Sequence, residues 1–324
     1  MTAYNRIDLP PEGTSHIQVE FQTSDSLADR VHLLGSTEIH AINAAIASGR
    51  PLLVRGEPGT GKSQLARAAA KQLGRVFVSY VIDSHTESRD LMWRFDAVGR
   101  LADAQLAGAT KHSDQVQTVL AVENYLEPGP LWWAFDWAGG EKQGQKVNLP
   151  PPPQPDGGVW HNGSVLLLDE IDKAESETPN GLLEALGTRA FTPQGRIEPV
   201  RVQGTLPLVV ITTNEERALP DAFLRRCLVL RLSLPKDESE LTDFLMQRGR
   251  AHFPKAAETV LKRAAEMLCK DRHAAIEAQV TPRPGQAEYL DLLRAVLDME
   301  KMTTKQLALL DVVAHYTLKK YVEI

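Results

Sequence analysis

The stretch GEPGTGKS at positions 56–63 decides the fold. It matches the spacing GxxxxGK followed by Ser or Thr, and it consists of Gly56, Glu57, Pro58, Gly59, Thr60, Gly61, Lys62 and Ser63. The apolar residues 51–55 precede it, and an amphipathic stretch with Leu65 and Ala69 follows it. This order predicts a strand, a tight loop and a helix, which is the setting in which such a loop wraps a phosphate.

Each residue type in this loop has a physical reason. Glycines let the backbone wrap closely, so that N–H groups point at the β-phosphate of a nucleotide, and the N-terminus of the following helix adds partial positive charge. Lys62 would reach the β- and γ-phosphates, and the Ser63 hydroxyl would bind a Mg²⁺ ion that bridges them. The loop therefore predicts binding of ATP with Mg²⁺.

Two carboxylates follow a second apolar run, in the sequence LLLDEID at residues 166–172. Ligands of open α/β sheets bind at the carboxyl ends of strands, where these acidic side chains fall. We expect Asp169 to hold the Mg²⁺ through water and Glu170 to act as general base on the attacking water. Asn214 ends a further run, residues 208–213, and its amide would hydrogen-bond that water or the γ-phosphate next to Glu170.

Short β-rich apolar runs alternate with helical stretches between residues 31 and 235, which predicts a parallel sheet sandwiched by helices. The runs are residues 51–55, 76–82, 165–168, 208–213 and 228–232. Beyond Pro235 apolar residues recur at helical spacing, as in Leu241, Phe244 and Leu245, which predicts a small α-helical lid domain. We therefore divide the chain into an extension (1–30), an α/β core (31–235) and a lid (236–324).

A long connection separates the second and third of those runs. It holds all five tryptophans of the chain and the polyproline run at residues 150–153, and it is too long for a plain loop. We interpret residues from about 91 to 163 as an insert, with a mobile stretch near residues 139–160. A hairpin is expected at residues 191–200, with its turn at residues 193–195.

Composition excludes several classes of protein. The net charge of −6 gives no global basic field, which argues against a protein whose main task is to coat nucleic acid. The two cysteines, Cys227 and Cys269, have no metal-ligand or disulfide spacing. The chain shows no leader pattern and no apolar run of about 18 residues, so we expect a reduced, cytoplasmic protein without a membrane span.

Four motifs resemble those of the AAA+ superfamily of P-loop NTPases. GEPGTGKS is similar to Walker A, LLLDEID to Walker B, ITTNEE at residues 211–216 to sensor 1, and LPDAFLRRC at residues 219–227 to the arginine-finger segment. GPL at residues 129–131 and LLEALGTRAFTPQGRIEPV at residues 182–200 resemble the MoxR group of the helix-2-insert clade. The likeness covers roughly residues 31–300 and implies an ATPase that converts ATP and water to ADP and phosphate.

The resemblance also implies roles for three arginines. Arg226 corresponds best to the finger that enters the site of the neighbouring subunit and offsets charge on the γ-phosphate, and Arg225 is the second candidate. Arg283, in the sequence TPRP at residues 281–284, resembles sensor 2 and would report nucleotide state to the lid. The residues themselves predict a helix there, with Thr281 as N-cap and Pro282 in its first turn.

The family implies a homo-oligomer, a hexameric ring, that remodels a protein substrate in a chaperone-like way. MoxR-type proteins commonly act with a partner that carries a von Willebrand factor A domain. Three alternatives stay open: a DNA-linked motor or loader, a P-loop small-molecule kinase, and a switch that binds ATP without turnover. The acidic balance disfavours the first, the acidic pair with Asn214 and a distant finger disfavours the second, and Glu170 disfavours the third.

Overall fold

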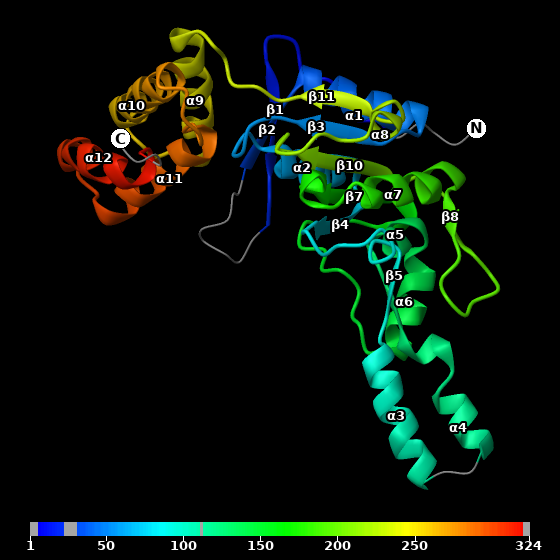
Figure 1. Cartoon of the computed structure of the whole chain (residues 1–324). Coiled ribbons are helices and arrows are strands. Elements are labelled where there is room, and N and C mark those ends of the chain that lie inside the picture. Colours follow the sequence, from blue (N-terminus) through cyan, green and yellow to red (C-terminus); the bar gives the residue numbers. More distant parts are fainter. Residues whose placement is uncertain (1–5, 23–30, 111–112, 320–324) are drawn as a thin grey trace. The chain divides into compact units, whose positions relative to one another are not determined.

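The computed structural model describes residues 6–22, 31–110 and 113–319 of the 324-residue chain. The chain divides into two compact units, whose elements are labelled in Figure 1. The sheet unit comprises residues 1–9, 37–55 and 66–230, and the helical unit comprises residues 10–36, 56–65 and 231–324. Among the described residues, no helix has both the length and the apolar character needed to cross a membrane.

A five-stranded sheet forms the centre of the sheet unit in the described part of the chain. Its order is β11 (Leu228–Arg231), β3 (Leu52–Arg55), β10 (Leu208–Thr213), β7 (Ser164–Asp169) and β4 (Val76–Val81). The pairs β3–β10, β10–β7 and β7–β4 are parallel. Every residue of β10 is buried, as expected for a strand covered on both faces. The α/β fold expected from the alternating apolar runs is confirmed.

Helices flank this sheet (Figure 1). They are α1 (Ser36–Ser48), α2 (Lys62–Leu73), α5 (Pro130–Phe135), α7 (Glu177–Thr188) and α8 (Asp221–Leu224). The short helix α5 packs on β4 and β7, and Trp132 and Trp133 are buried there. Trp132 makes an edge contact with Phe191, with ring centroids 6.2 Å apart. This part of the predicted insert thus belongs to the core of the unit, because α5 is apolar on every side.

The remainder of the long connection carries a helical hairpin. The antiparallel pair β5 (Trp93–Phe95) and β6 (Leu126–Pro128) forms its base. Between these strands lie α3 (Ala97–Thr110), α4 (Ser113–Val119) and the 3-10 turn Val122–Tyr125. Figure 1 shows α3 and α4 extending beyond β5 and β6, away from the sheet. The chain then forms α6 (Trp137–Lys146) and the 3-10 turn Trp160–Asn162 before it enters β7.

The proline-rich segment after α6 lies along β4, which is an edge strand of the sheet. The Gln154 side chain accepts a hydrogen bond from Phe77 N (2.7 Å) and donates one to Phe77 O (2.8 Å). Asp156 pairs with Arg67 of α2 at 2.6 Å. We expected residues 139–160 to be mobile. They form most of α6 and a segment whose side chains bond to β4 and α2. An amide side chain that bonds both backbone groups of one residue can replace a strand and cover the edge.

The helical unit contains a β-hairpin and a bundle of helices. Strands β1 (His16–Glu20) and β2 (Val31–Gly35) pair antiparallel, so a strand lies where the sequence predicted only an extension. The helices are α9 (Glu238–His252), α10 (Glu258–Glu277), α11 (Gln286–Met299) and α12 (Thr303–Thr317). Apolar side chains at helical spacing, such as Leu245, Leu268 and Leu293, are buried between them. Residues 1–5 and 23–30 of the predicted extension lie outside the described residues.

The start of α11 differs from the prediction. The helix begins at Gln286 with Gly285 as N-cap, and Glu288 accepts a hydrogen bond from Gly285 N at 2.9 Å. Thr281 was expected to cap a helix that contained Arg283. The expectation was wrong because a residue that precedes proline avoids the helical region, and both Thr281 and Arg283 precede a proline.

We expect Gln154→Ala to lower the free energy of unfolding by about 1–2 kcal/mol, because both backbone groups of Phe77 lose their partner. The measurement is the urea midpoint of the purified protein. Gln145→Ala is the matched control, since Gln145 is exposed on α6. Equal midpoints for the two variants would show that the proline-rich segment does not stabilise β4.

Candidate active site

The phosphate loop follows β3 directly, and its backbone has the expected shape. Gly59 and Gly61 have φ angles of +73° and +89°, which a residue with a side chain rarely adopts. Thr60 donates its hydroxyl to Glu57 O at 2.9 Å. Helix α2 then begins at Lys62, and Leu65 N donates to Gly61 O at 3.0 Å. The phosphate loop thus leads directly into the N-terminus of α2, where a helix favours an anion.

Lys62 is buried within this loop. Its Nζ donates to Gly56 O (2.8 Å) and Glu57 O (2.9 Å). A Cβ at Gly56 would lie 2.3 Å from Leu232 O, so no larger residue fits there. The loop thus places an ammonium inside a ring of backbone groups, which suits the oxygens of a phosphate.

Two arginines of the helical unit meet the loop at Glu57. Arg272 of α10 is buried and pairs with Glu57 at 2.6 Å, and it also donates to Pro284 O at 3.0 Å. Arg283 lies 3.8 Å from the same carboxylate. Arg283 is the arginine that the sequence motif predicted, whereas Arg272 was not predicted. Position 272 falls within a regular helix and carries no motif, so only its burial identifies it.

Three buried polar atoms near the loop have no hydrogen-bond partner among the described residues: His32 Nε2, Gln64 Oε1 and Arg283 Nε. His32 lies against Gly61, and burial lowers its pKa to about 3, with further contributions from the charges of Arg248 and His252. Its imidazole is therefore neutral at physiological pH. Orphaned polar atoms beside a phosphate loop are those that a bound polar ligand would satisfy, so the residues present fit a nucleotide.

The acidic group lies where β7 and β10 end, within the sheet unit. Thr212 of β10 donates its hydroxyl to Asp169 Oδ1 and accepts a hydrogen bond from Glu170 N at 2.9 Å. Residue 211 pairs with residue 168 in the register, so residues 212 and 169 come next along both strands. Thr212, which no sequence motif predicted, fixes the backbone around both carboxylates.

Glu170 has a left-handed backbone conformation, with φ +62°, and it has two polar neighbours. Asn214 Nδ2 donates to its Oε1 at 3.4 Å, and Lys173 Nζ lies 2.5 Å from its Oε2. The hydrogen bond with Glu170 raises the pKa of Lys173, so this ammonium stays charged. The predicted neighbours Glu170 and Asn214 are brought together, and Lys173 is an additional member of the group.

Asp172 holds the connection that carries Asn214. Its carboxylate accepts hydrogen bonds from Asn214 N (3.4 Å) and Glu216 N (2.9 Å), and its side chain is buried. The sequence shows Asp172 as the third acid of LLLDEID without indicating a role for it. Because it bonds backbone N–H groups, Asp172 positions Asn214 opposite Glu170.

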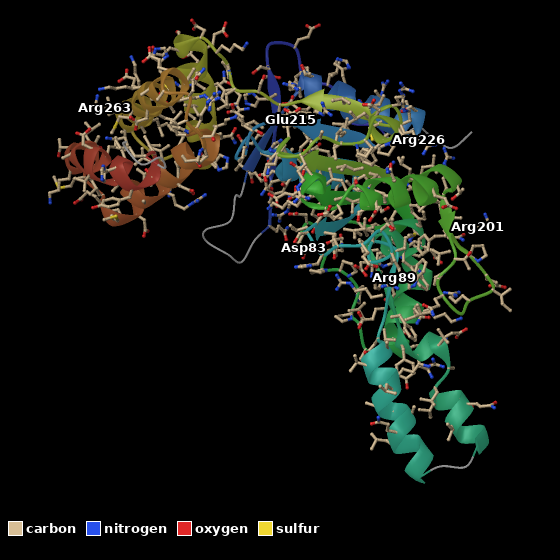
Figure 2. The ribbon with its side chains drawn as sticks, viewed as in Figure 1. Asp83, Arg89, Arg201, Glu215, Arg226 and Arg263 are labelled. Carbon is tan, nitrogen blue, oxygen red and sulfur yellow. The ribbon has the colours of Figure 1, made fainter. Side chains whose placement is uncertain are left out.

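Arg225 and Arg226 follow α8 and have exposed side chains. Figure 2 labels Arg226. Within the residues that the structure describes, neither guanidinium forms an ion pair or a hydrogen bond. The arginine pair therefore lies at the surface of the sheet unit, where it is accessible to a group outside the unit. The helix α8 before the pair is anchored by Phe223, which is fully buried.

The oxygen donors expected for Mg²⁺ are present in the two motifs. Mg²⁺ typically binds through one or two protein oxygens together with substrate phosphates and water. Ser63 supplies a hydroxyl at the second position of α2, and Asp169 supplies a carboxylate at the end of β7. No group of three or more acidic, His or Cys ligands occurs among the described residues. Each of the two groups is of the kind that binds an ion arriving with a nucleotide.

Residues 51–248 match the model of the family described as AAA domain, dynein-related subfamily. The chain belongs to this AAA family. The match includes the phosphate loop, the acidic group and Arg226. Arg283 lies beyond its end.

Solved structures of similar fold include a protein from Cytophaga hutchinsonii described as a candidate ATPase. It is 14% identical, with a TM-score of 0.39, and the match covers 87% of this chain and 79% of that one. A point mutant of RuvB from Thermotoga maritima is 16% identical, with a TM-score of 0.44, and the match covers 86% of this chain and 68% of that one. A search of the curated proteins gives no match.

We expect Lys62→Ala to weaken ATP binding by about 100-fold or more, because one ammonium makes charge-assisted hydrogen bonds to phosphate oxygens that the AAA loop cannot replace. Isothermal titration calorimetry measures the change. The control is Lys71→Ala, which removes a lysine from the same helix outside the loop. An unchanged dissociation constant for Lys62→Ala would overturn the phosphate assignment.

Proposed function

We propose that this AAA protein is an ATP-hydrolysing ring motor of the MoxR type that remodels or activates a protein partner. The observation that carries the proposal is the contact between Glu170 and Asn214 at the ends of two central strands. A carboxylate and an amide at hydrogen-bond distance can hold one water molecule between them, with the carboxylate as acceptor of its proton. A binding switch without turnover has no need of this pair.

Nucleotide binding is assigned to the loop. Its backbone N–H groups and Lys62 hold the β- and γ-phosphates, and Ser63 and Asp169 hold Mg²⁺. When bound, Mg²⁺ offsets charge on the phosphate oxygens. Gly56 is bonded to Arg55, which pairs with Thr213 in the register, and Asn214 follows. The loop therefore begins where β3 ends, and the neighbouring strand β10 ends at the same level, directly before Asn214.

Hydrolysis is assigned to contacts between subunits. Arg225 and Arg226 are exposed, and within the described residues they have no acidic partner in their own chain. An arginine at this place would neutralise charge on the γ-phosphate bound by a neighbouring copy, an effect on the order of 10³–10⁵ in rate in comparable enzymes. We assign Arg226 as the finger and Arg225 as the alternative. In a closed assembly each subunit then supplies its finger to the site of the next subunit, as in the hexameric ring that the family resemblance implies.

Arg283 is assigned as the sensor of nucleotide state in the helical unit. Its contact with Glu57 ties it to the loop, and its buried Nε lacks a partner among the described residues. A γ-phosphate would compete with Glu57 for this guanidinium because both are anionic oxygen groups. Exchange between the two would move α11, which begins three residues later.

Two exposed surfaces of the sheet unit suit contact with a protein partner. The hairpin formed by β8 (Ala190–Phe191) and β9 (Val200–Arg201) carries Ile197, which is 98% exposed. Helix α3 exposes Val98, Leu101 and Leu106. Apolar groups in these positions favour a protein surface over a nucleic acid, whose backbone requires positive charge. By family resemblance, the partner carries a von Willebrand factor A domain.

Turnover per subunit should rise with protein concentration, because the finger arrives only on assembly. The measurement is steady-state release of phosphate from ATP and Mg²⁺ over a dilution series of the purified chain. Glu170→Gln is the control and should lose about 10²–10⁴ in turnover while it still binds ATP. Constant, appreciable turnover down to the dilute monomer would instead indicate a self-contained site, as in a kinase.

Arg226→Ala should lose turnover alone and regain part of it when mixed with Glu170→Gln. In a mixed assembly, the intact site of Arg226→Ala meets the intact finger of Glu170→Gln, so one class of interface becomes complete. Turnover is measured over a range of mixing ratios. Arg225→Ala is the matched control and should keep most of its turnover without mixing. Absence of recovery for both variants at every ratio would contradict a finger that acts on the neighbouring subunit.

A further inference from the structure

The backbone that carries the arginine pair ends in three carbonyl groups that bind one side chain. Helix α8 has only four residues, Asp221–Leu224, so few of the carbonyls after it have backbone partners. Arg50 Nη2 donates to Arg225 O at 2.5 Å and to Cys227 O at 3.1 Å, and Arg50 Nε donates to Arg226 O at 3.1 Å. A single guanidinium therefore caps the end of this segment.

A second contact joins the same two segments. Leu228 N donates to Pro51 O at 2.8 Å, where β11 begins beside β3. Residues 50 and 51 thus hold residues 225–228 through both the side chain and the backbone. The fork of an arginine presents several N–H donors in a fixed plane, so it constrains the orientation of the peptide groups as well as their distance.

These contacts fix the backbone of the arginine pair and leave its side chains exposed. Phe223 and Cys227 are buried on either side of it, and Arg50 binds the carbonyls between and after them. The reach of Arg226 therefore depends on a backbone whose position Arg50 sets. In a reaction that needs a guanidinium at the γ-phosphate, a displacement of about 1 Å costs on the order of 10²-fold in rate.

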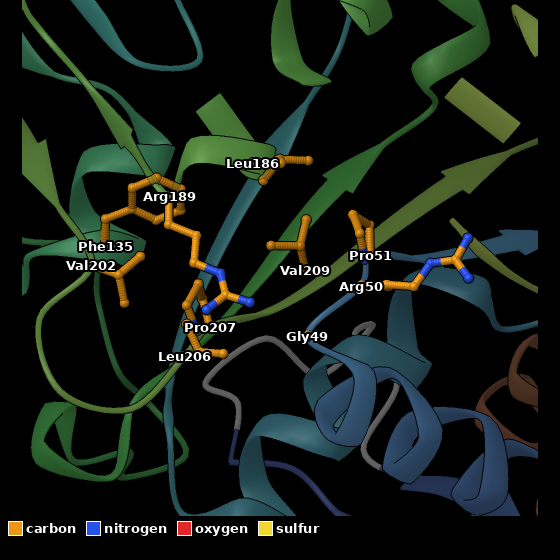
Figure 3. Close-up of a pocket in the computed structure, with 10 residues that line it drawn as sticks. All are labelled: Gly49, Arg50, Pro51, Phe135, Leu186, Arg189, Val202, Leu206, Pro207 and Val209. Atoms are coloured by element: carbon orange, nitrogen blue, oxygen red, sulfur yellow. The ribbon is translucent and has the colours of Figure 1, made fainter. Parts of the chain in front are cut away.

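Arg50 also lines a small pocket with Phe135, Leu186 and Arg189 (Figure 3). In Figure 3 the Arg50 side chain extends away from Arg189. The hydrogen bonds of the guanidinium go to the three carbonyls, so the arginine segment is the feature that it holds.

We propose that Arg50 is a positioning residue for the arginine finger, holding the backbone of residues 225–227 so that Arg226 reaches the nucleotide of the neighbouring subunit. The inference rests on the proposed function, in which that finger acts between subunits. Arg50 lies two residues before β3 begins at Leu52, and the other end of this strand leads into the phosphate loop. One strand therefore connects the loop of a subunit to the finger that the subunit offers to its neighbour.

The test uses the full-length Arg50→Ala variant. ADP affinity should stay within about twofold of the unchanged protein, because the phosphate loop of the variant is intact. Turnover should fall by on the order of 10²-fold, because the finger is displaced. Mixing with Glu170→Gln should restore part of the turnover, as for Arg226→Ala. If Arg50→Ala damaged the fold of its own subunit, a neighbouring subunit could not restore turnover. Recovery on mixing therefore distinguishes a displaced finger from a damaged fold.

Two further variants complete the test. Arg50→Lys keeps the charge but lacks the planar fork, so we expect reduced turnover that mixing with Glu170→Gln restores. If Arg50→Ala does not fold, Arg50→Lys provides the test. The double variant Arg50→Ala with Arg226→Ala should turn over no more slowly than Arg226→Ala, because both changes remove one function.

Three results would overturn the proposal. They are unchanged turnover in both Arg50 variants, a lower turnover of the double variant than of Arg226→Ala, and recovery of Arg226→Ala on mixing without recovery of either Arg50 variant. Failure of both Arg226→Ala and Arg225→Ala to recover would instead contradict the proposed function.

Discussion

The parallel pairing of β10 with β3 on one side and β7 on the other is the constraint on which the rest of the sheet unit depends. It sets Thr213 opposite Arg55 and Ile211 opposite Leu168, so the three strands end at the same edge. Because side chains alternate along β10, its last two threonines point to opposite faces and have different partners. Thr212 bonds Asp169 and Glu170, and Thr213 accepts a hydrogen bond from Glu215 N. A slip of one residue would exchange these roles and separate Asn214 from Glu170.

A second constraint acts within the helical unit, where charge is balanced locally around the phosphate loop. Glu57 sits in a loop built to attract anions, and Arg272 and Arg283 approach its carboxylate from the helical bundle. Arg272 is the better placed of the two, because it is buried and has a second acceptor at Pro284 O. Arg283 has the longer contact, and its Nε has no partner among the described residues. The pair thus contains one arginine that is anchored and one that can exchange partners, which agrees with a sensor role for Arg283.

Local sequence patterns predicted the five strands of the central sheet, the phosphate loop and the Glu170–Asn214 pair, because each depends on a buried run and the polar residues directly after it. Features set by distant contacts could not be predicted in this way. Arg272 meets Glu57 across 215 positions, and Arg50 meets Arg226 across 176. The tryptophans near α5 were assigned to an insert because they lie within the long connection between two strands, although their burial makes them core residues. The start of α11 was misplaced because a proline can begin a helix, while consecutive X-Pro steps delay it.

The two sets of arginines differ in a way that bears on how hydrolysis is controlled. Arg272 and Arg283 contact an acidic residue of the loop in their own unit, whereas Arg225 and Arg226 have exposed side chains on a backbone held by Arg50. A rigid backbone with exposed guanidinium groups suits a group that acts on an external anion, since the ordering cost of binding is limited to the side chain. If the fingers found their target within one subunit, no exposure would be needed. The arrangement supports the proposal that hydrolysis depends on a neighbouring subunit, with Arg50, just before the strand that leads into the phosphate loop, holding the proposed finger.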